Sequence, residues 1–396
     1  MRLTNCILLL FLLLLTSGCV YPYYSELEGY DGMLVVEGHI VAGGISKIMI
    51  SRSDGLDLDP FYRFYRRKSL NEMNVWLETE GGQDIKAEFI NEMDDLNYRA
   101  YGYYKLDCPE LKAGDRCRLM IGGSKAEPEY ESDWITVLEA PVIDSLSLNV
   151  NKQTKQLELL ADLHSPGEEN AYYMVLSDEV WELHAQERAY YRYDAELDTI
   201  LYQRFSDTYY CWRYSDSTFS SVGAAKNVSD GRIQGFKYRT INREDERLKE
   251  MFKSEVKAFR ISEEAWLYWN NLDETTSGGA DLFTPTPSNR RGNFHRHGMP
   301  SEHVIGYLSA SEFSCDSIYY DNFEHRFFFS ISHTSPISDL FTAVRRENWL
   351  KAWQSGYTPY QYGEEIWNWV PQWCVDCTSS KGSTKKRPEG WPNDHF

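Results

Sequence analysis

Three histidines that lie close together in the sequence are the best candidates for metal chemistry. His295 and His297 flank Arg296, and His303 follows shortly afterwards. Alternate residues of a β-strand point to the same face, where neutral imidazoles can share a borderline metal such as zinc or copper. The glycines and the proline around the cluster favour an exposed, mobile loop instead. We therefore keep metal binding as a hypothesis and expect the loop.

Six further residues could form covalent cross-links: Cys108, Cys117, Cys211, Cys315, Cys374 and Cys377. An even set of thiols is expected to pair if the chain works outside the reducing cytosol. Cys108 and Cys117 flank a predicted turn, so we expect a bridge across a hairpin or its loop.

The motif Cys374-Val375-Asp376-Cys377 allows three chemistries. It can form a structural disulfide, within the motif or to Cys211 or Cys315, or it can supply half of a metal site or a redox-active dithiol. A thioredoxin-like dithiol needs a strand-to-helix context in a βαβ unit, which the surrounding sequence does not predict. A structural disulfide is favoured, and its connectivity stays open.

Aromatic rings provide the positive case for binding, because the chain has 28 Tyr and 12 Trp. Rings on rigid strands or loops can stack on sugars, peptide side chains or cations with little entropy loss. The candidate ligand contacts are Tyr62, Tyr65, Tyr191, Tyr193 and Trp212, and the tryptophans between Trp349 and Trp373 could form a core lid or a docking surface. Large β domains also bury many tyrosines, so we expect most rings to pack.

Familiar catalytic patterns are missing from the sequence. There is no nucleophile elbow, no zinc-protease helix, no phosphate-binding glycine loop and no dinucleotide fingerprint. The net charge of −19 at pH 7 disfavours nucleic acid, and it also disfavours charge-driven binding to an anionic bilayer. Triads assembled from distant positions are recognised only by geometry. We expect a protein without enzymatic activity and without a cofactor.

The N-terminal residues determine where these groups would work. Arg2, an apolar run from Ile7 to Leu15, and small residues lead directly to Cys19, as in a bacterial lipoprotein signal. The run is shorter than the ~20 apolar residues that span a bilayer. We expect residues 1–18 to be removed and residues 19–32 to form a tether with palmitate-type acyl chains on Cys19. An ordinary secretory signal cut near Gly18 is the alternative.

The elements that would position these groups are mostly strands. Short β-branched segments separated by turn residues fill residues 33–141 and predict an antiparallel β-sandwich. Residues 142–396 predict a larger β-rich domain with one or two helices. Ser262 can cap a helix that carries Trp266 and Trp269 at helical spacing.

Several short segments, taken in order, resemble one family. They are Leu34–Gly38, Cys211-Trp212, Ile261–Leu272, Gly292-Asn293 before Val304–Tyr307, and Cys374–Thr378 with Gly382 and Trp391. In this arrangement the chain resembles a Bacteroidota lipoprotein family known as domain of unknown function 4249. The resemblance implies an outer-membrane lipoprotein, a gene beside those of TonB-dependent transporters, and an immunoglobulin-like N-terminal domain. It implies no catalytic residues.

The sequence therefore leads to one expected function and two alternatives. We expect a lipid-anchored outer-membrane protein, at the cell surface or on the periplasmic face. It would bind an extracellular solute such as a peptide or glycan, or a TonB-dependent transporter, in nutrient uptake. A structural or assembly subunit with protein-only contacts is one alternative, and a metal or metallophore binder is the other.

Overall fold

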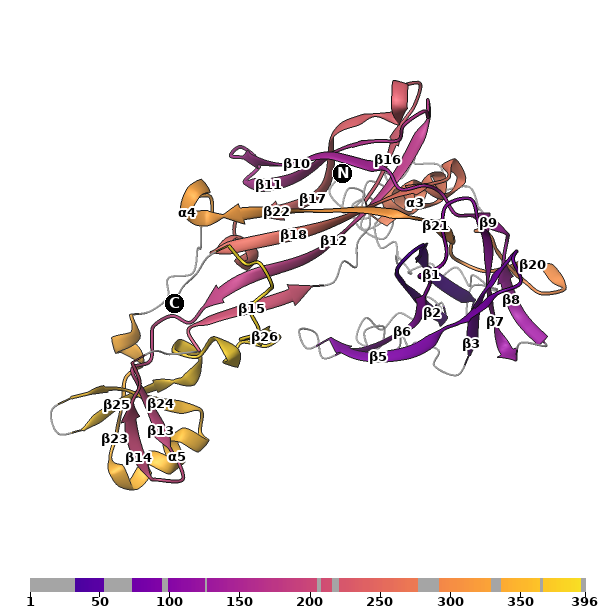
Figure 1. Cartoon of the computed structure of the whole chain (residues 1–396). Helices are drawn as coiled ribbons and strands as arrows, with labels where there is room; N and C mark the ends of the chain where they lie inside the picture. The colour runs from indigo at the N-terminus through magenta and orange to yellow at the C-terminus, as the bar shows by residue number, and fades with distance from the viewer. Residues whose placement is uncertain are drawn as a thin grey trace, which may run out of the picture.

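The computed structural model describes residues 33–52, 73–94, 99–124, 127–204, 208–215, 221–276, 292–328, 336–363 and 366–392. This part of the chain is mainly β, as the sequence predicts, with several antiparallel sheets and few helices. Figure 1 shows a β-sandwich at the right, a long sheet across the centre and a small module at the lower left. No helix within the described ranges is long and apolar enough to cross a membrane.

Two sheets face each other in the N-terminal part. The first has the order β21-β1-β2-β6-β5, with β1 (Leu34–Val41), β2 (Ile45–Arg52), β5 (Glu88–Asp94), β6 (Arg99–Asp107) and β21 (Ser309–Ser311). The second has the order β20-β19-β8-β7-β3-β4, with β3 (Asn74–Thr79), β4 (Asp84–Lys86), β7 (Arg116–Ser124), β8 (Glu127–Ser132), β19 (Phe294–Arg296) and β20 (Met299–His303); β9 (Ile135–Thr136) also pairs with β7. Ile48, Leu77 and Leu119 are fully buried in the core between the two sheets. The N-terminal part is therefore a β-sandwich.

Residues 292–311 come from far along the chain and extend both sheets. β19 pairs antiparallel with β8, and β21 pairs parallel with β1. Gly306 permits the close approach: a Cβ added there would lie 2.0 Å from the carbonyl oxygen of Val36, at a φ of 139°. The sandwich is thus neither purely antiparallel nor built from residues 33–141 alone. The boundary near residue 141 stays a prediction.

A long sheet with the order β22-β18-β12-β15-β26 forms the centre. Its strands are β12 (Ala171–His184), β15 (Tyr210–Ser215), β18 (Met251–Ile261), β22 (Phe313–Asp321) and β26 (Ser383–Thr384), and β16 (Ser221–Ala225) also pairs with β12. A second sheet packs on it and consists of β10 (Val142–Asn151), β11 (Gln156–His164) and β17 (Ile233–Asn242). Leu159, Tyr173 and Phe252 are fully buried in the shared core.

One long helix, α3 (Glu263–Thr276), confirms the helix predicted after Ser262. The Ser262 hydroxyl accepts a hydrogen bond from the Ala265 amide at 3.1 Å, as an N-cap does. Trp266 and Trp269 pack against the long sheet. The remaining helical segments are short: α4 (Asn322–His325), α5 (Trp349–Gln354), η1 (Ser229–Gly231), η2 (Glu246–Leu248), η3 (Ile337–Leu340), η4 (Arg346–Asn348), η5 (Gln372–Cys374) and η6 (Cys377–Ser379).

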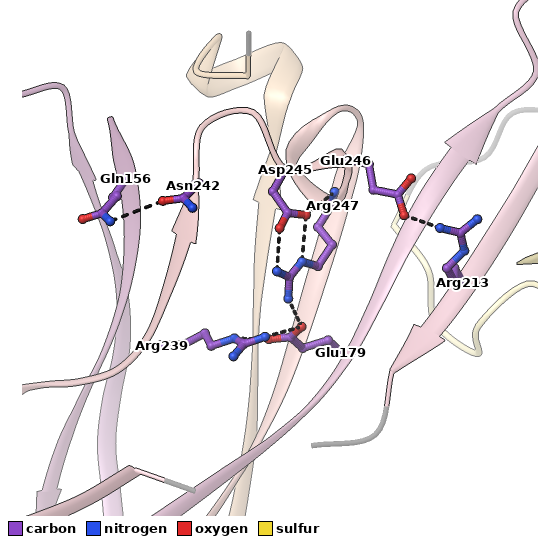
Figure 2. A network of polar contacts seen from close by, with 8 residues as sticks. All are labelled: Gln156, Glu179, Arg213, Arg239, Asn242, Asp245, Glu246 and Arg247. Carbon is purple, nitrogen blue, oxygen red and sulfur yellow. Dashed lines mark hydrogen bonds and ion pairs between the residues drawn. The ribbon is translucent and has the colours of Figure 1, made fainter. Parts of the chain in front are cut away.

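Figure 2 shows a network of charges that joins the two central sheets. The buried carboxylate of Glu179 on β12 accepts hydrogen bonds from Arg239 of β17 at 2.8 Å and from Arg247 of η2 at 2.6 Å. Asp245 accepts from Arg247 at 2.6 Å. Burial alone would raise the pKa of Asp245, but the hydrogen bonds and charge of Arg247 hold that pKa below its ordinary value. Because opposite charges meet at every step, we interpret the network as structural.

A small module lies at the end of the long sheet that is remote from the sandwich (Figure 1). It consists of the hairpin β13 (Tyr191–Asp194) and β14 (Thr199–Tyr202), the sheet β23 (Thr342–Val344), β25 (Trp367–Pro371) and β24 (Tyr357–Tyr362) in the order β23-β25-β24, and α5. We call residues 189–203 and 337–376 the distal module. A disulfide between Cys211 of β15 and Cys377 of η6 lies where it meets the long sheet.

Candidate functional site

The distal module has an aromatic interior. Tyr193 and Trp369 are buried, with ring centroids 5.7 Å apart, and Trp349 of α5 lies 6.3 Å from Tyr193. The Trp349 indole donates a hydrogen bond to the carbonyl of Val344 at 3.3 Å. Side chains alternate along a strand. Tyr191 therefore lies on the same face of its strand as Tyr193, and Trp367 lies on the same face of its strand as Trp369. The interior thus continues toward the surface through Tyr191 and Trp367.

Four rings form a continuous strip at the open end of this interior. Tyr202, Tyr191, Trp367 and Tyr362 follow one another with centroid distances of 5.7, 4.8 and 5.3 Å. Tyr191 pairs across the hairpin with Tyr202, and Trp367 pairs across its sheet with Tyr362. The outer rings Tyr202 and Tyr362 are 67% and 58% exposed. We call these four residues the aromatic seam.

Polar groups beside the aromatic seam include three phenol hydroxyls and one ion pair. In the described part of the chain, the hydroxyls of Tyr191, Tyr202 and Tyr362 have no hydrogen-bond partner. The nearby guanidinium of Arg192 pairs with the carboxylate of Asp194 at 3.6 Å. The seam therefore offers ring surface and phenol hydroxyls. This is chemistry for binding rather than for catalysis.

The predicted aromatic contacts do not converge on one site. Tyr191 lies in the aromatic seam, whereas Tyr193 is buried behind it. Trp212 is buried on β15 in a cluster with Met251 and Trp391. Neither Tyr193 nor Trp212 therefore exposes a ring face to a ligand. Tyr62 and Tyr65 lie outside the described residues.

Tyr202 and Tyr362 are seam residues that the candidate ligand contacts of the sequence analysis did not include, and Tyr362 is the more distant of the two from Tyr191 in the sequence. A signal for Tyr362 exists, because Tyr360 and Tyr362 alternate along a strand just before Trp367 and Trp369 do the same. Two alternating aromatic pairs separated by a short connection are typical of a hairpin with one aromatic face. Tyr362 pairs with Trp367 as this pattern predicts. A β-bulge, however, makes Pro359 the partner of Trp369, and Tyr360 packs with Phe341 in a separate cluster.

The histidine cluster lies on a β-hairpin rather than in the loop that we expected. His295 belongs to β19, which pairs with β8 on one side and with β20 on the other. On β20, the backbone of His303 pairs with that of His295. The imidazoles of His295 and His297 both hydrogen-bond to one oxygen of Glu131, at 3.2 and 3.0 Å. Within the described ranges no three His, Cys, Asp or Glu side chains are grouped to hold a metal ion. The metal hypothesis thus gains no support here.

Glu131 is the centre of this cluster. Arg118 donates to its other oxygen at 2.8 Å. Burial alone would raise the pKa of Glu131, but the hydrogen bond from His297 and the charge of Arg118 outweigh burial and lower it from its ordinary value of 4.5. Because the folded pKa lies below the unfolded one, the stabilising contribution of Glu131 is fully present above about pH 4.5 and is lost as the pH falls through the folded pKa.

We expect Glu131→Gln to lower the free energy of unfolding by about 1–3 kcal/mol at pH 7, since the charge-assisted hydrogen bonds are lost. Urea unfolding of wild type and variant at pH 7 and pH 3 measures this, and the difference should shrink at pH 3. Asp133→Asn, at a carboxylate that is 66% exposed, is the matched control with little effect. An equal loss at both pH values would contradict the assignment.

The structure corrects one of the predicted disulfides. Cys108 and Cys117 are separate, buried thiols in the sandwich core. Cys108 follows β6 of one sheet and Cys117 lies on β7 of the other, so the connection crosses the sandwich and does not form a hairpin. Burial raises the pKa of Cys108 to about 11 and that of Cys117 to about 12. Both therefore behave as core side chains.

The motif at residues 374–377 contributes only one of its thiols to a disulfide. Cys377 pairs with Cys211, which was among the pairings that the sequence left open. Cys374 is a buried free thiol whose pKa burial raises to about 11, and Cys315 is an exposed free thiol. A thiol that is held protonated is a poor nucleophile. The arrangement does not favour a redox-active dithiol.

Comparison with known proteins gives one match. A family model described as domain of unknown function (DUF4249) matches residues 20–314. No curated protein matches the chain. The matched residues include the sandwich, most of the long sheet and the hairpin β13–β14. The β23–β25 part of the distal module lies beyond them.

Proposed function

We propose that this chain, which belongs to the family described as domain of unknown function (DUF4249), is a lipid-anchored protein of the outer membrane. In this proposal it binds an extracellular solute and passes it to a TonB-dependent transporter. It catalyses no reaction. The single observation that carries the binding role is the aromatic seam, where the outer rings Tyr202 and Tyr362 are exposed at the ends of a strip of contacting rings.

The position of the seam supports such a role. The distal module lies at the end of the long sheet that is remote from the sandwich (Figure 1). β12 alone is 14 residues long, which corresponds to roughly 45 Å of extended strand. The sandwich carries the first described residue after the proposed tether. An anchor at Cys19 would therefore hold the sandwich at the membrane, with the seam on the opposite end of a rigid arm.

The fixed geometry of the seam also supports binding. The inner ring Trp367 packs against the buried cluster of Tyr193 and Trp369, and the ring of Tyr191 lies 4.8 Å from that of Trp367. Gln203, next to the seam, is held by hydrogen bonds to the carbonyls of Tyr190 at 2.8 Å and Ala189 at 3.1 Å. Rings that are already ordered lose little freedom when a ligand stacks on them.

Lipid attachment at Cys19 can be tested directly. We expect labelled palmitate to enter the wild-type chain and the protein to sediment with outer membranes. Cys19→Ala should abolish the label and release the protein, because several acyl chains at one residue are needed for stable anchoring. Cys315→Ala, at a thiol that the structure exposes, is the matched cysteine control and should label normally. Equal labelling of Cys19→Ala and wild type would contradict the proposal.

A further inference from the structure

The distal module has exposed apolar side chains at the turn of its hairpin and on the adjoining helix. Leu197, in the turn between β13 and β14, is 67% exposed, and Leu350 and Trp353 of α5 are 47% and 45% exposed. We call these three residues the turn-helix face. We infer that the turn-helix face binds the same face of a second copy of this chain. This inference goes beyond the proposed function and does not depend on it.

The three side chains belong to one surface because Tyr193 joins the two elements. The Tyr193 hydroxyl donates a hydrogen bond to Asp198, the neighbour of Leu197, at 2.7 Å. The ring of Tyr193 also lies 6.3 Å from that of Trp353. Leu350 and Trp353 are three residues apart on α5, so they lie on the same side of the helix. The turn of the hairpin therefore lies beside α5.

The turn that presents Leu197 is held in a fixed conformation. The carboxylate of Asp194 accepts hydrogen bonds from the backbone amides of Glu196 at 3.1 Å and Leu197 at 3.2 Å. The hydrogen bond from Tyr193 to Asp198 holds the other side of the turn. An apolar side chain on an ordered turn loses little freedom when a partner covers it. Because a turn protrudes, the face suits another protein surface better than a small molecule.

Charges of opposite sign border the turn-helix face on its two sides. The hairpin carries more carboxylates than cations, whereas α5 and the residues just before it carry more cations than carboxylates. These residues are Asp194, Glu196, Asp198 and Arg192 on the hairpin, and Arg345, Arg346, Lys351 and Glu347 on residues 345–354. Glu196 is exposed next to Leu197, and Lys351 is exposed next to Leu350. Glu364 and Glu365 of the same module follow Tyr362 and lie outside the described residues.

A surface with this charge pattern is complementary to a copy of itself. In a dimer with two-fold symmetry, the hairpin of each protomer meets α5 of its partner, so carboxylates face cations twice while the apolar side chains meet between them. The net charge of the whole chain is −19, which makes copies repel unless locally neutral surfaces meet. The turn-helix face is locally neutral, because its four carboxylates are matched by four cations. An anionic bilayer would instead be repelled by the hairpin.

The test is sedimentation equilibrium of the detergent-extracted full-length chain, at a solvent density that matches the detergent. Wild type is compared with Leu197→Asp, Trp353→Ala, Glu196→Lys and Lys351→Glu. Leu272→Asp is the matched control, because Leu272 on α3 is 43% exposed but lies outside the distal module. Thermal unfolding identifies any variant that fails to fold. The exposed sites Leu197, Glu196 and Lys351 keep the comparison valid if Trp353→Ala does not fold.

We expect wild type to dimerise with a dissociation constant in the micromolar range, as is typical of a small interface. Leu197→Asp and Trp353→Ala should each raise this constant by about tenfold, because the apolar centre of an interface supplies most of its affinity. Leu272→Asp should dimerise like wild type.

The two charge variants provide a test that is specific for a symmetric interface. Glu196→Lys and Lys351→Glu should each weaken the homodimer by about three- to tenfold, because each places like charges opposite one another. An equimolar mixture of the two variants should form a heterodimer as tight as the wild-type dimer, since each reversed charge then meets its opposite. A general loss of stability cannot produce this recovery.

Three outcomes of the sedimentation experiment would overturn the inference. Wild type stays monomeric at ~100 μM, far above a micromolar dissociation constant; the variants dimerise like wild type; or the mixture of charge variants does not recover. Photocrosslinking from position 197 in intact membranes identifies the occupant independently. Crosslinks to a second copy are expected, and crosslinks to lipid or to a different protein instead would show that the occupant is wrong.

Discussion

Replacing both Cys211 and Cys377 by alanine is expected to lower the free energy of unfolding by about 2–5 kcal/mol. The bond joins residues 166 positions apart, so its loss frees a long loop in the unfolded chain. Both sulfurs are buried, and their removal also leaves a gap in the core of the long sheet. Urea unfolding under oxidising conditions measures the change.

The same substitution should loosen the distal module more than the rest of the protein. The junction otherwise depends on backbone hydrogen bonds such as Cys377 N–H to Thr208 at 2.8 Å and Glu187 N–H to Cys374 at 2.9 Å. Hydrogen exchange should therefore rise first in residues 189–203. Cys315→Ala, which removes an exposed free thiol, should leave both measurements unchanged. A double variant as stable as wild type would show that the bond does not fix the module.

Acid should lower the free energy of unfolding because His39 is buried as a neutral ring, and this is the second large effect that we expect. Burial lowers the pKa of His39 from 6.5 to about 3. Its Nε2 hydrogen-bonds to the Ser311 hydroxyl at 3.0 Å, and its ring lies 4.5 Å from that of Phe259, between the sandwich and the long sheet. The neutral ring is thus part of the packing between these two parts.

The direction of the pH effect follows from proton binding. Between about pH 3 and pH 6.5 the unfolded chain protonates this histidine and the folded chain does not. The free energy of unfolding should therefore fall by about 1.4 kcal/mol per pH unit, and by about 4–5 kcal/mol over the whole interval, as the pH decreases. Above about pH 6.5 His39 is neutral in both the folded and the unfolded chain, so its full contribution to stability is present.

Substitution of His39 isolates this contribution. His39→Phe can keep the contact with Phe259 but leaves Ser311 without its partner, at a cost of about 1–3 kcal/mol that does not depend on pH. Its stability should then decline less steeply with acid than that of wild type, in urea unfolding between pH 7 and pH 4. His325→Gln, at an exposed ring, is the control and should keep the wild-type slope. Identical slopes for wild type and His39→Phe would contradict the assignment.

Local patterns predicted the local structure well. The helix after Ser262 could be predicted from the N-cap at Ser262 and from the two carboxylates in its first turn. These signals lie within one turn of each other, so they can be recognised from a short stretch of sequence. The strands of the sandwich follow from β-branched segments with glycine turns, as in the hairpin β1–β2. The mainly β fold and the family therefore follow from the sequence.

Contacts between distant segments could not be predicted in the same way. The strand pairs β19–β8 and β21–β1 join residues that lie far apart in the chain, and only a close approach of the backbone at Gly306 reveals why glycine is needed there. Cys108 and Cys117 are near neighbours in sequence, yet Cys108 follows β6 of one sheet and Cys117 lies on β7 of the other. Sequence separation alone gave the wrong cross-link there.

The aromatic seam illustrates the same limit for the candidate site. Tyr191 was predicted as a ligand contact, but its neighbours come from β14, β24 and β25, and the last two lie far along the chain. Tyr193 has the same residue type and lies two positions away, yet Trp349 and Trp369 bury it. Which ring is exposed depends on the packing of α5 and β25, and no local pattern contains that information.

One measurement tests the central claim most directly: affinity purification of the lipidated chain from detergent-extracted membranes, followed by thermal unfolding of the purified material with and without each member of a panel of peptide and glycan solutes. The account predicts a TonB-dependent transporter in stoichiometric amount and an unfolding temperature that at least one of these solutes raises. Tyr362→Ala should keep the transporter and lose the temperature shift. A chain that purifies alone, or with a partner whose complex no solute stabilises, would contradict a role in uptake and would favour an assembly subunit.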